Sequence, residues 1–121
     1  MNHTLSLLFL LVAAHAVMDF PLQGDMVATQ KSRHSTHAIQ QHVPWLYWLA
    51  AHALSHGLAV ALVTGSAALG MWETLVHCVI DFGKCEKWFN IHVDQLLHVL
   101  CKVLWVGLLL WHPSMSSWRN W

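Results

Sequence analysis

The stretch VHCVIDFGK, residues 76–84, closes an apolar segment and carries His77 and Asp81 four residues apart. The stretch AHAVMDFPLQ, residues 14–23, closes another apolar segment and repeats this spacing with His15 and Asp19. Residues four apart lie on one face of a helix, so each pair can direct two polar side chains at one target. Such costly polar pairs within apolar segments need a shared partner, and this requirement guides the fold prediction.

Composition points to a membrane protein of one domain. The chain has 121 residues, of which 56% are hydrophobic and only 10% are charged, whereas soluble domains carry about 25% charged residues. A span needs about 20 apolar residues, and the apolar segments are short but sufficient for helices over 4–20, 45–63, 67–82 and 90–111. We therefore predict an all-α integral membrane four-helix bundle over 1–121 with one long loop, 21–44.

The few basic residues predict the orientation. With four spans, the segments 21–44 and 83–90 lie on one side and hold Lys31, Arg33, Lys84 and Lys87, whereas the other side holds Arg119. The positive-inside rule places those two segments in the cytoplasm and both termini on the non-cytoplasmic side. Net charge is zero, so no nucleic-acid partner is expected and the lipid bilayer is the expected partner.

The first apolar segment has a second interpretation. The run at 5–14 followed by Ala14-His15-Ala16 has the form of a signal peptide with an A-x-A cleavage site. The usual positive n-region is missing, because Asn2 and His3 are the only polar residues among the first three. Cleavage would remove His15, so the metal-site prediction below assumes that this segment is retained.

Four pairs of ligand-type residues, one on each predicted helix, share the four-residue spacing. The pairs occur at the cytoplasmic ends of the first and third helices and near the cytoplasmic starts of the second and fourth, so all four should lie in a similar layer. They are His15/Asp19, His52/His56, His77/Asp81 and Asp94/His98. A single intramembrane histidine is more often a helix–helix hydrogen bond, but each charged group costs about 2.5–3.5 kcal/mol on insertion scales. Four matched pairs at one level therefore favour a metal site.

Eight such ligands suit two divalent metal ions. Imidazole and carboxylate ligands without sulfur favour zinc, manganese or iron. Two divalent ions and one hydroxide balance the charges of Asp19, Asp81 and Asp94, and neutrality is favoured in a low-dielectric setting. The three cysteines have no C-x-x-C spacing, so they are expected to be reduced thiols instead of ligands.

Other polar residues are candidates for the reaction itself. Glu73 lies four residues before His77 and is a candidate base, and Lys102 lies four after His98 and can hold a substrate anion. Gln23, Lys31 and Arg33 are candidate substrate-binding residues, because the loop 21–44 can fold over the cytoplasmic mouth and bind a phosphate group. Helix packing, snorkelling and a solvated loop are the alternative roles for these five residues.

These motifs resemble a small family of bacterial and phage membrane proteins, domain of unknown function 3307. The matching pieces are HAVMDFPLQ at 15–23, then Met26, Ala28, Lys31, Ser32 and His52, HCVIDF at 77–82 with Lys84, and DQLLH at 94–98. The resemblance covers nearly the whole chain and implies a multi-helix membrane protein of a bacterium or a phage-infected host. A looser similarity, in the His/Asp pattern, is to the membrane-bound metal-dependent hydrolases.

The function predicted first is dinuclear metal-dependent hydrolysis of a phosphate-containing or lipid-like substrate at the cytoplasmic face of a bacterial inner membrane. Metals in such a site polarise the scissile group and supply hydroxide. Three alternatives stay open: a metal-stapled structural or interaction protein such as a phage accessory factor, a di-iron oxidoreductase, and a metal transporter. Transport by a monomer is disfavoured because the outer helix halves are apolar apart from Lys102, so a path would require an oligomer.

Overall fold

In a computed structural model, residues 2–117 are described, and they fold into helices with no β-strand among them. The α-helices are α1 (His3–Asp19), α2 (Gly24–Gln30), α3 (Trp45–Thr64), α4 (Ala67–Cys85) and α5 (Ile91–Trp111). Two short 3-10 helices are η1 (Ala38–Gln41) and η2 (Pro113–Met115). The all-α prediction is confirmed. Arg119, which entered the orientation argument, lies outside the described residues.

Local sequence sets where the long helices begin. The side chains of Asn2, Ser66 and Asn90 accept hydrogen bonds from backbone N–H groups in the first turns of α1, α4 and α5. Such caps satisfy donors that have no partner within the helix. Pro44 stands directly before α3, where its missing N–H costs nothing.

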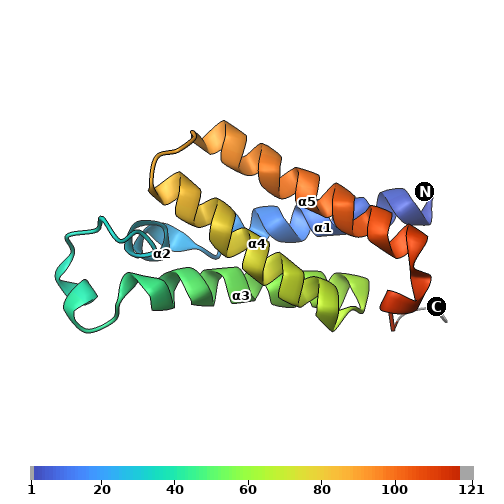
Figure 1. The fold of residues 1–121 in the computed structure, drawn as a ribbon, viewed down its shortest axis with the longest axis horizontal. Coiled ribbons are helices and arrows are strands. Elements are labelled where there is room, and N and C mark those ends of the chain that lie inside the picture. Colours follow the sequence, from blue (N-terminus) through green and yellow to red (C-terminus); the bar gives the residue numbers. More distant parts are fainter. Residues whose placement is uncertain (1, 118–121) are drawn as a thin grey trace.

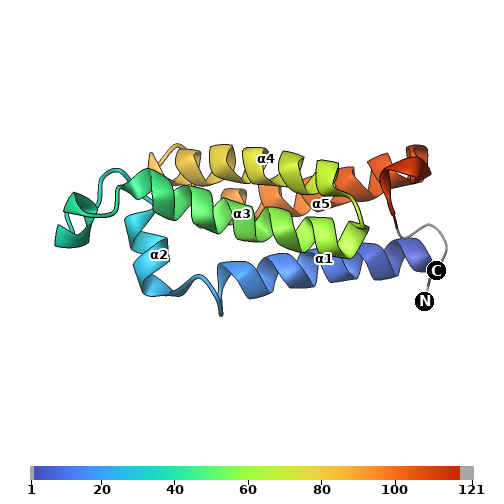
Figure 2. The ribbon, with the colours of Figure 1, turned by 90° about the horizontal axis from the view of Figure 1, so that it is seen from below.

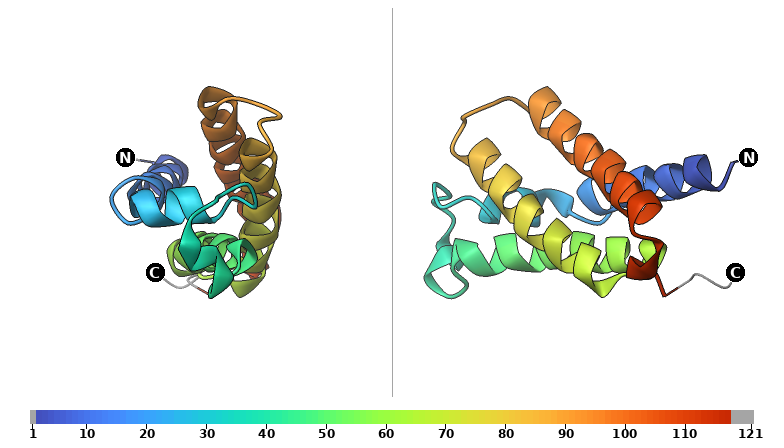
Figure 3. Two further views of the ribbon diagram at one scale, coloured as in Figure 1. Left: turned by 90° about the vertical axis from the view of Figure 1, so that its left-hand side faces the viewer. Right: turned by 45° about the vertical axis from the view of Figure 1, so that its right-hand side comes forward.

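The four long helices surround a common interior. Helix α1 contacts α3 and α5, and α4 contacts the same two helices, so each long helix has two long neighbours (Figures 2 and 3). The start of α1, the α3–α4 turn and the end of α5 lie at one end of the molecule, whereas α2 and the α4–α5 turn lie at the other (Figure 1). Polar pairs placed near this second end of each helix therefore come to one level.

Helices α3 and α4 form an antiparallel hairpin with an unusually close contact. A Cβ atom on Gly57 would lie 2.5 Å from the carbonyl oxygen of Gly70 and 1.9 Å from Oγ1 of Thr74. A Cβ atom on Gly70 would lie 2.6 Å from the carbonyl oxygen of Gly57. Both positions therefore require glycine, because only glycine lets the two backbones approach this closely.

Helix α4 continues past the residue at which its end was predicted. The range 67–82 ended before Gly83, yet α4 runs to Cys85 and the chain turns at Lys87, whose φ is 61°. The N–H groups of Lys87 and Trp88 donate to the carbonyls of Lys84 and Gly83, a Schellman arrangement closed by a lysine. Gly83 instead leaves room for an aromatic ring, because an added Cβ would lie 2.9 Å from Phe89.

The segment 21–44, predicted as a loop, adds a fifth α-helix. Helix α2 is bent by 86° from α1, and Gly24, with φ +63°, starts it at this bend (Figure 2). The chain then returns through η1 to α3. Four α-helices were therefore too few, because a short helix of seven residues held by tertiary contacts has little periodic signal in the sequence.

The molecule has an apolar exterior, and a large part of its interior is polar, unlike a soluble domain. Large apolar side chains on the outer faces of all four long helices are exposed, among them Phe9, Leu58, Val79 and Leu104. Among the described residues, fourteen polar or charged residues are buried against ten hydrophobic ones. An exposed apolar surface of this extent is typical of contact with lipid.

Two helices, α3 and α5, are long and apolar enough to cross a membrane, and a third span results if the bent pair of α1 and α2 counts as one. Membrane association is therefore supported, but the expectation of four spans is not. Helix α4 is absent from this set because Glu73, Asp81 and Lys84 fall within its nineteen residues. Glu73 and Asp81 are buried and face the other helices instead of the exterior.

Candidate metal centre

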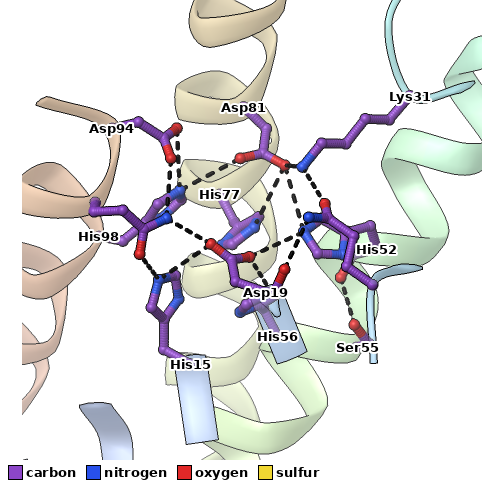
Figure 4. Close-up of polar contacts among 12 residues, drawn as sticks. His15, Asp19, Lys31, His52, Ser55, His56, His77, Asp81, Asp94 and His98 are labelled. Atoms are coloured by element: carbon purple, nitrogen blue, oxygen red, sulfur yellow. Dashed lines mark hydrogen bonds and ion pairs between the residues drawn. The ribbon is translucent and has the colours of Figure 1, made fainter. Parts of the chain in front are cut away.

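All eight ligand-type residues of the four pairs converge inside the ring of long helices (Figure 4). Helix α1 contributes His15 and Asp19, α3 contributes His52 and His56, α4 contributes His77 and Asp81, and α5 contributes Asp94 and His98. None is more than 8% exposed. The four-residue spacing works because each helix directs both members of its pair into the same interior layer.

One group of four donors is centred on Asp19. Its Oδ1 atom lies 3.1 Å from Nε2 of His56 and 3.3 Å from Nε2 of His52. Together with His77, these residues offer donor atoms that all lie within 4.8 Å of one another. Ligand atoms around a tetrahedral ion with bonds of about 2.0–2.1 Å stand about 3.3–3.4 Å apart, so this group fits a metal such as zinc.

Two further groups adjoin the first. Nε2 of His98 lies 3.4 Å from Oδ1 of Asp81 and 3.7 Å from Oδ1 of Asp94. His15 joins His77 and His98 in a third group of donors within the same 4.8 Å limit. The rings of His77 and His98 are stacked with their centroids 4.2 Å apart, so the three groups form one continuous cluster.

Several donor atoms of this cluster have no hydrogen-bond partner among the described residues. They are Nδ1 of His15, Oδ1 of Asp19, Nε2 of His52, Nε2 of His56, both ring nitrogens of His77, and Oδ1 of Asp94. Burying a polar atom without a partner costs free energy, and native interiors pair almost all such atoms. Imidazole nitrogens and carboxylate oxygens that face one another inside a ring of helices could hold a metal ion.

A second layer holds the ligands in place. Nε2 of Gln95 donates to Oδ2 of Asp19 at 2.7 Å and to Oδ2 of Asp94 at 3.1 Å, and its Oε1 lies 3.3 Å from Nε2 of His15. The amide of Gln23 donates to the carbonyl oxygen of Asp19 at 2.9 Å. Metal ligands commonly depend on such outer partners for their orientation. Gln23 therefore contacts the backbone of a candidate ligand.

Lys31 enters the cluster instead of lining a mouth. It is 2% exposed, and its Nζ atom donates to Oδ2 of Asp81 and to Oε1 of Gln23. The chain around it is ordered by Gln30, whose side-chain oxygen accepts from Oγ of Ser35 and from Nε2 of Gln40. The ammonium group is therefore an internal charge of this site (Figure 4).

Arg33 points away from the cluster. Its guanidinium donates two hydrogen bonds of 2.7 Å to the carboxylate of Glu86, which also contacts Nε2 of His34 at 3.0 Å. The hydrogen bonds from Arg33 lower the pKa of Glu86, and the contact with His34 acts in the same direction. Arg33 thus ties the 31–37 segment to the end of α4, and no described contact brings it to the ligands.

Glu73 and Lys102 lie one layer deeper and pair with each other. Nζ of Lys102 donates to Oε1 of Glu73, and Nε1 of Trp105 donates to its Oε2 at 2.6 Å. The same Oε1 atom lies 3.4 Å from Nδ1 of His77. Both charged residues are 1% exposed, and the carboxylate of Glu73 lies beside the ring of His77.

A pocket reaches the cluster from the α2 end. It has a volume of about 250 Å³, and Asp19 and Gln95, which contact the cluster, form part of its lining. Its lining also contains two charged residues, Lys84 from α4 and Asp25 from α2, together with the apolar residues Phe20 and Ile91. A molecule in this pocket would meet a cation, a carboxylate and two apolar side chains beside a candidate ligand.

A family model matches residues 7–120, a range that includes all eight ligand-type residues. Its description is "Protein of unknown function (DUF3307)". The chain belongs to the DUF3307 family. Searches of the curated proteins and of the solved structures found no match. The similarity of this DUF3307 protein to membrane-bound metal-dependent hydrolases therefore has no support from the comparisons.

Sequence reasoning missed some contacts that shape the site of this DUF3307 protein. Trp105 was not singled out, although its indole N–H donates to Glu73, because an apolar helix with several tryptophans offers no sign of which one turns inward. Gln30 was missed as well, and its buried side chain orders the segment that carries Lys31. The only available signal was a glutamine directly before a lysine, which is too common to be informative.

Proposed function

We propose that this protein is an integral membrane protein that binds a divalent metal ion in the cluster and uses it for hydrolysis at the cytoplasmic face of a bacterial inner membrane. The observation that carries the proposal is the set of unpartnered, buried donor atoms contributed by four helices. Imidazole and carboxylate donors without sulfur favour zinc, manganese or iron. When bound, such an ion supplies Lewis-acid activation of water and of a scissile bond.

The charge distribution supports the proposed orientation. Lys84 and Lys87 lie at the α2 end, where the segment with Lys31 and Arg33 also lies. Basic residues favour the cytoplasmic side, so this end is proposed to face the cytoplasm and both chain ends the opposite side. The metal cluster then lies within reach of the cytoplasmic boundary of the bilayer.

The pocket supports a substrate with an anionic group and an apolar part. Lys84 provides a positive charge at the rim, while Phe20 and Ile91 provide exposed apolar surface beside it. A phosphate-containing lipid or lipid-like molecule combines these features at the depth where head groups lie. Lys84 replaces Lys31 and Arg33 as the proposed anion-binding residue, because those two are engaged by Asp81 and Glu86.

The chain's own residues have distinct roles in this proposal. Gln95 orients Asp19 and His15, and the carboxylate of Glu73 lies beside Nδ1 of His77, where it restricts the orientation of the ring. Lys102 holds Glu73 in this place by pairing with it. Glu73 and Lys102 are thus proposed to position His77 instead of acting on the substrate.

A structural role for the ion is the second candidate, because the donors come from four different helices and are almost completely buried. An ion bound by Asp19, His52, His56 and His77 would join α1, α3 and α4, which stabilises the fold whether or not any reaction occurs. In a structural metal site, protein ligands fill every coordination position of the ion, whereas a catalytic site keeps one coordination position open for water or substrate. The pocket that reaches Asp19 and Gln95 favours the enzymatic role.

Metal analysis of the full chain purified in detergent tests the proposal. We expect divalent metal in the wild type and its loss in His52→Ala and Asp19→Ala, with His92→Ala, an exposed histidine on α5, as the matched control that keeps the metal. Unchanged metal content in the first two variants would refute the site.

Activity measurements separate the two roles. We expect metal-dependent release of phosphate from phosphatidic acid in mixed micelles, reduced in Lys84→Met while the metal content stays constant. Metal that is retained without hydrolysis of phosphatidic acid or of bis-p-nitrophenyl phosphate would favour the structural role. Iron with a visible absorption band would instead favour an oxidoreductase.

A further inference from the structure

Lys31 is a cation supplied by the chain within a cluster of candidate metal ligands. We propose that its ammonium group takes the place of a second metal ion, so that the centre holds one divalent ion and one lysine. This inference rests on the proposed metal site and specifies its composition. Two metal ions were expected from the sequence because eight ligand-type residues were counted, and Lys31 was predicted to bind substrate and so did not enter the charge balance.

The charge balance changes once Lys31 is counted as an internal residue. Counted with neutral imidazoles and with no bound hydroxide, Asp19, Asp81 and Asp94 carry three negative charges and Lys31 offsets one of them, which leaves a net charge of −2. The Glu73–Lys102 pair is neutral and does not alter this balance. Net charge in a low-dielectric interior is costly, and a single divalent ion brings the cluster to neutrality.

The position of Lys31 also restricts where an ion can lie. Its Nζ atom bonds to Oδ2 of Asp81, and the same oxygen lies 3.5 Å from Nε2 of His52. A second ion bridging Asp81 and His52 would therefore stand beside the ammonium group, and like charges a few ångströms apart repel strongly in a low-dielectric setting. The other oxygen of Asp81 faces His98 at 3.4 Å.

The group centred on Asp19 is the place that we propose for the single ion. Its four members supply one carboxylate and three imidazoles, donor types that zinc uses, and a catalytic ion would take three of them and keep its fourth position open. Unpartnered atoms of Asp19, His52 and His56 face one another there. Lys31 makes no described contact with Asp19, His56 or His77, so binding at this group does not require its displacement.

Lys31 is held in this place by the fold. A lysine at a membrane boundary ordinarily extends toward water, which keeps its charge hydrated. Lys31 instead receives a second acceptor from Oε1 of Gln23, and the following segment is fixed by the bonds of Ser35 and Gln40 to Gln30. A charge secured by this many contacts is a constant part of the centre.

The test counts metal ions per chain in the full-length protein in detergent, by elemental analysis and by calorimetric titration with Zn²⁺ or Mn²⁺ alone. We expect one ion in the wild type and in Lys31→Arg, which keeps the positive charge. Lys31→Met removes the charge and should bind two ions. Lys31→Gln, which retains a donor to Asp81, repeats this neutralisation with less risk to folding. Lys87→Met is the matched control at an exposed lysine and should bind one ion.

The outcomes separate this inference from the proposed function. Two ions in the wild type or in Lys31→Arg would overturn the inference and leave the metal site intact. One ion in both neutral variants, with a dissociation constant within twofold of the wild type, would also overturn it. Absence of bound metal in the wild type would instead overturn the proposed function.

Discussion

The interior of the four long helices has two halves of opposite character. The half toward α2 holds the histidines, the aspartates and Lys31, whereas the half toward the α3–α4 turn holds an apolar core. This core consists of Leu11, Val60, Leu69, Trp105, Val106 and Leu109. The apolar half needs no bound partner, because close packing and dispersion forces between its side chains are enough to stabilise it. The polar half leaves buried nitrogen and oxygen atoms without hydrogen-bond partners, and these are the atoms that the proposed cation would bind.

The largest effect is expected at the pair that separates the two halves. Lys102→Met would leave the carboxylate of Glu73 buried without its cation, and breaking a buried ion pair in this way costs about 3–5 kcal/mol. Unfolding in detergent, followed by tryptophan fluorescence, measures the loss. The double variant Lys102→Met with Glu73→Gln should recover most of it, and a loss below about 1 kcal/mol would show that this layer is hydrated.

Removal of the metal ion should lower the stability of the fold through the polar half alone. A ligand that binds only the folded state stabilises it by about 2.7 kcal/mol when its free concentration is 100 times the dissociation constant. We therefore expect a chelator to lower the unfolding temperature of the wild type and to have no effect on Asp19→Asn. A chelator effect of equal size in that variant would place the ion elsewhere.

A substitution in the apolar half should lower the stability of the fold without changing metal binding. Leu69 is 0% exposed, and Leu69→Ala creates a cavity that we expect to cost about 2 kcal/mol. Metal content measured in the same preparation should equal that of the wild type. If the variant lost its metal, the two halves would be coupled more tightly than their separate compositions suggest.

The smallest effect is expected at Trp105, which belongs to both halves. Its ring is part of the apolar core, and its indole N–H donates to Oε2 of Glu73. Trp105→Phe keeps most of the apolar surface and removes a hydrogen bond to a charged group, for which we expect a loss of about 1.5 kcal/mol. The additional loss should be smaller in a Glu73→Gln background, where the acceptor is neutral, as a double-mutant cycle would show.

The sequence predicted the polar half well where spacing along a helix decides the geometry. Each pair on α1, α3, α4 and α5 keeps its four-residue interval, and the alternating helix directions bring the pairs to one level. Such contacts depend on helix geometry and topology only. The metal role of these eight residues stays a prediction until bound metal is measured.

Contacts made by the segment 21–44 were not predictable in the same way. Lys31 and Arg33 are both basic residues of the same polar segment, so the sequence alone does not distinguish them. Lys31 is buried against Asp81, whereas Arg33 pairs with Glu86 near the surface. The difference depends on the bend after α1 and on Gln30, which local propensity does not encode. The partner of Lys102 was likewise uncertain, because a carboxylate on another helix can be identified only after the helices are placed.

The glycine contact between α3 and α4 has a consequence for how the chain enters a bilayer. Helix α4 carries three charged residues and is too polar to partition into lipid as a separate segment, whereas α3 is not. Gly57 and Gly70 allow the two backbones to meet before the remaining helices arrive. We therefore expect α3 and α4 to insert into the bilayer together, as one hairpin. A larger residue in place of Gly57 or Gly70 should impair this insertion, a step that precedes metal binding.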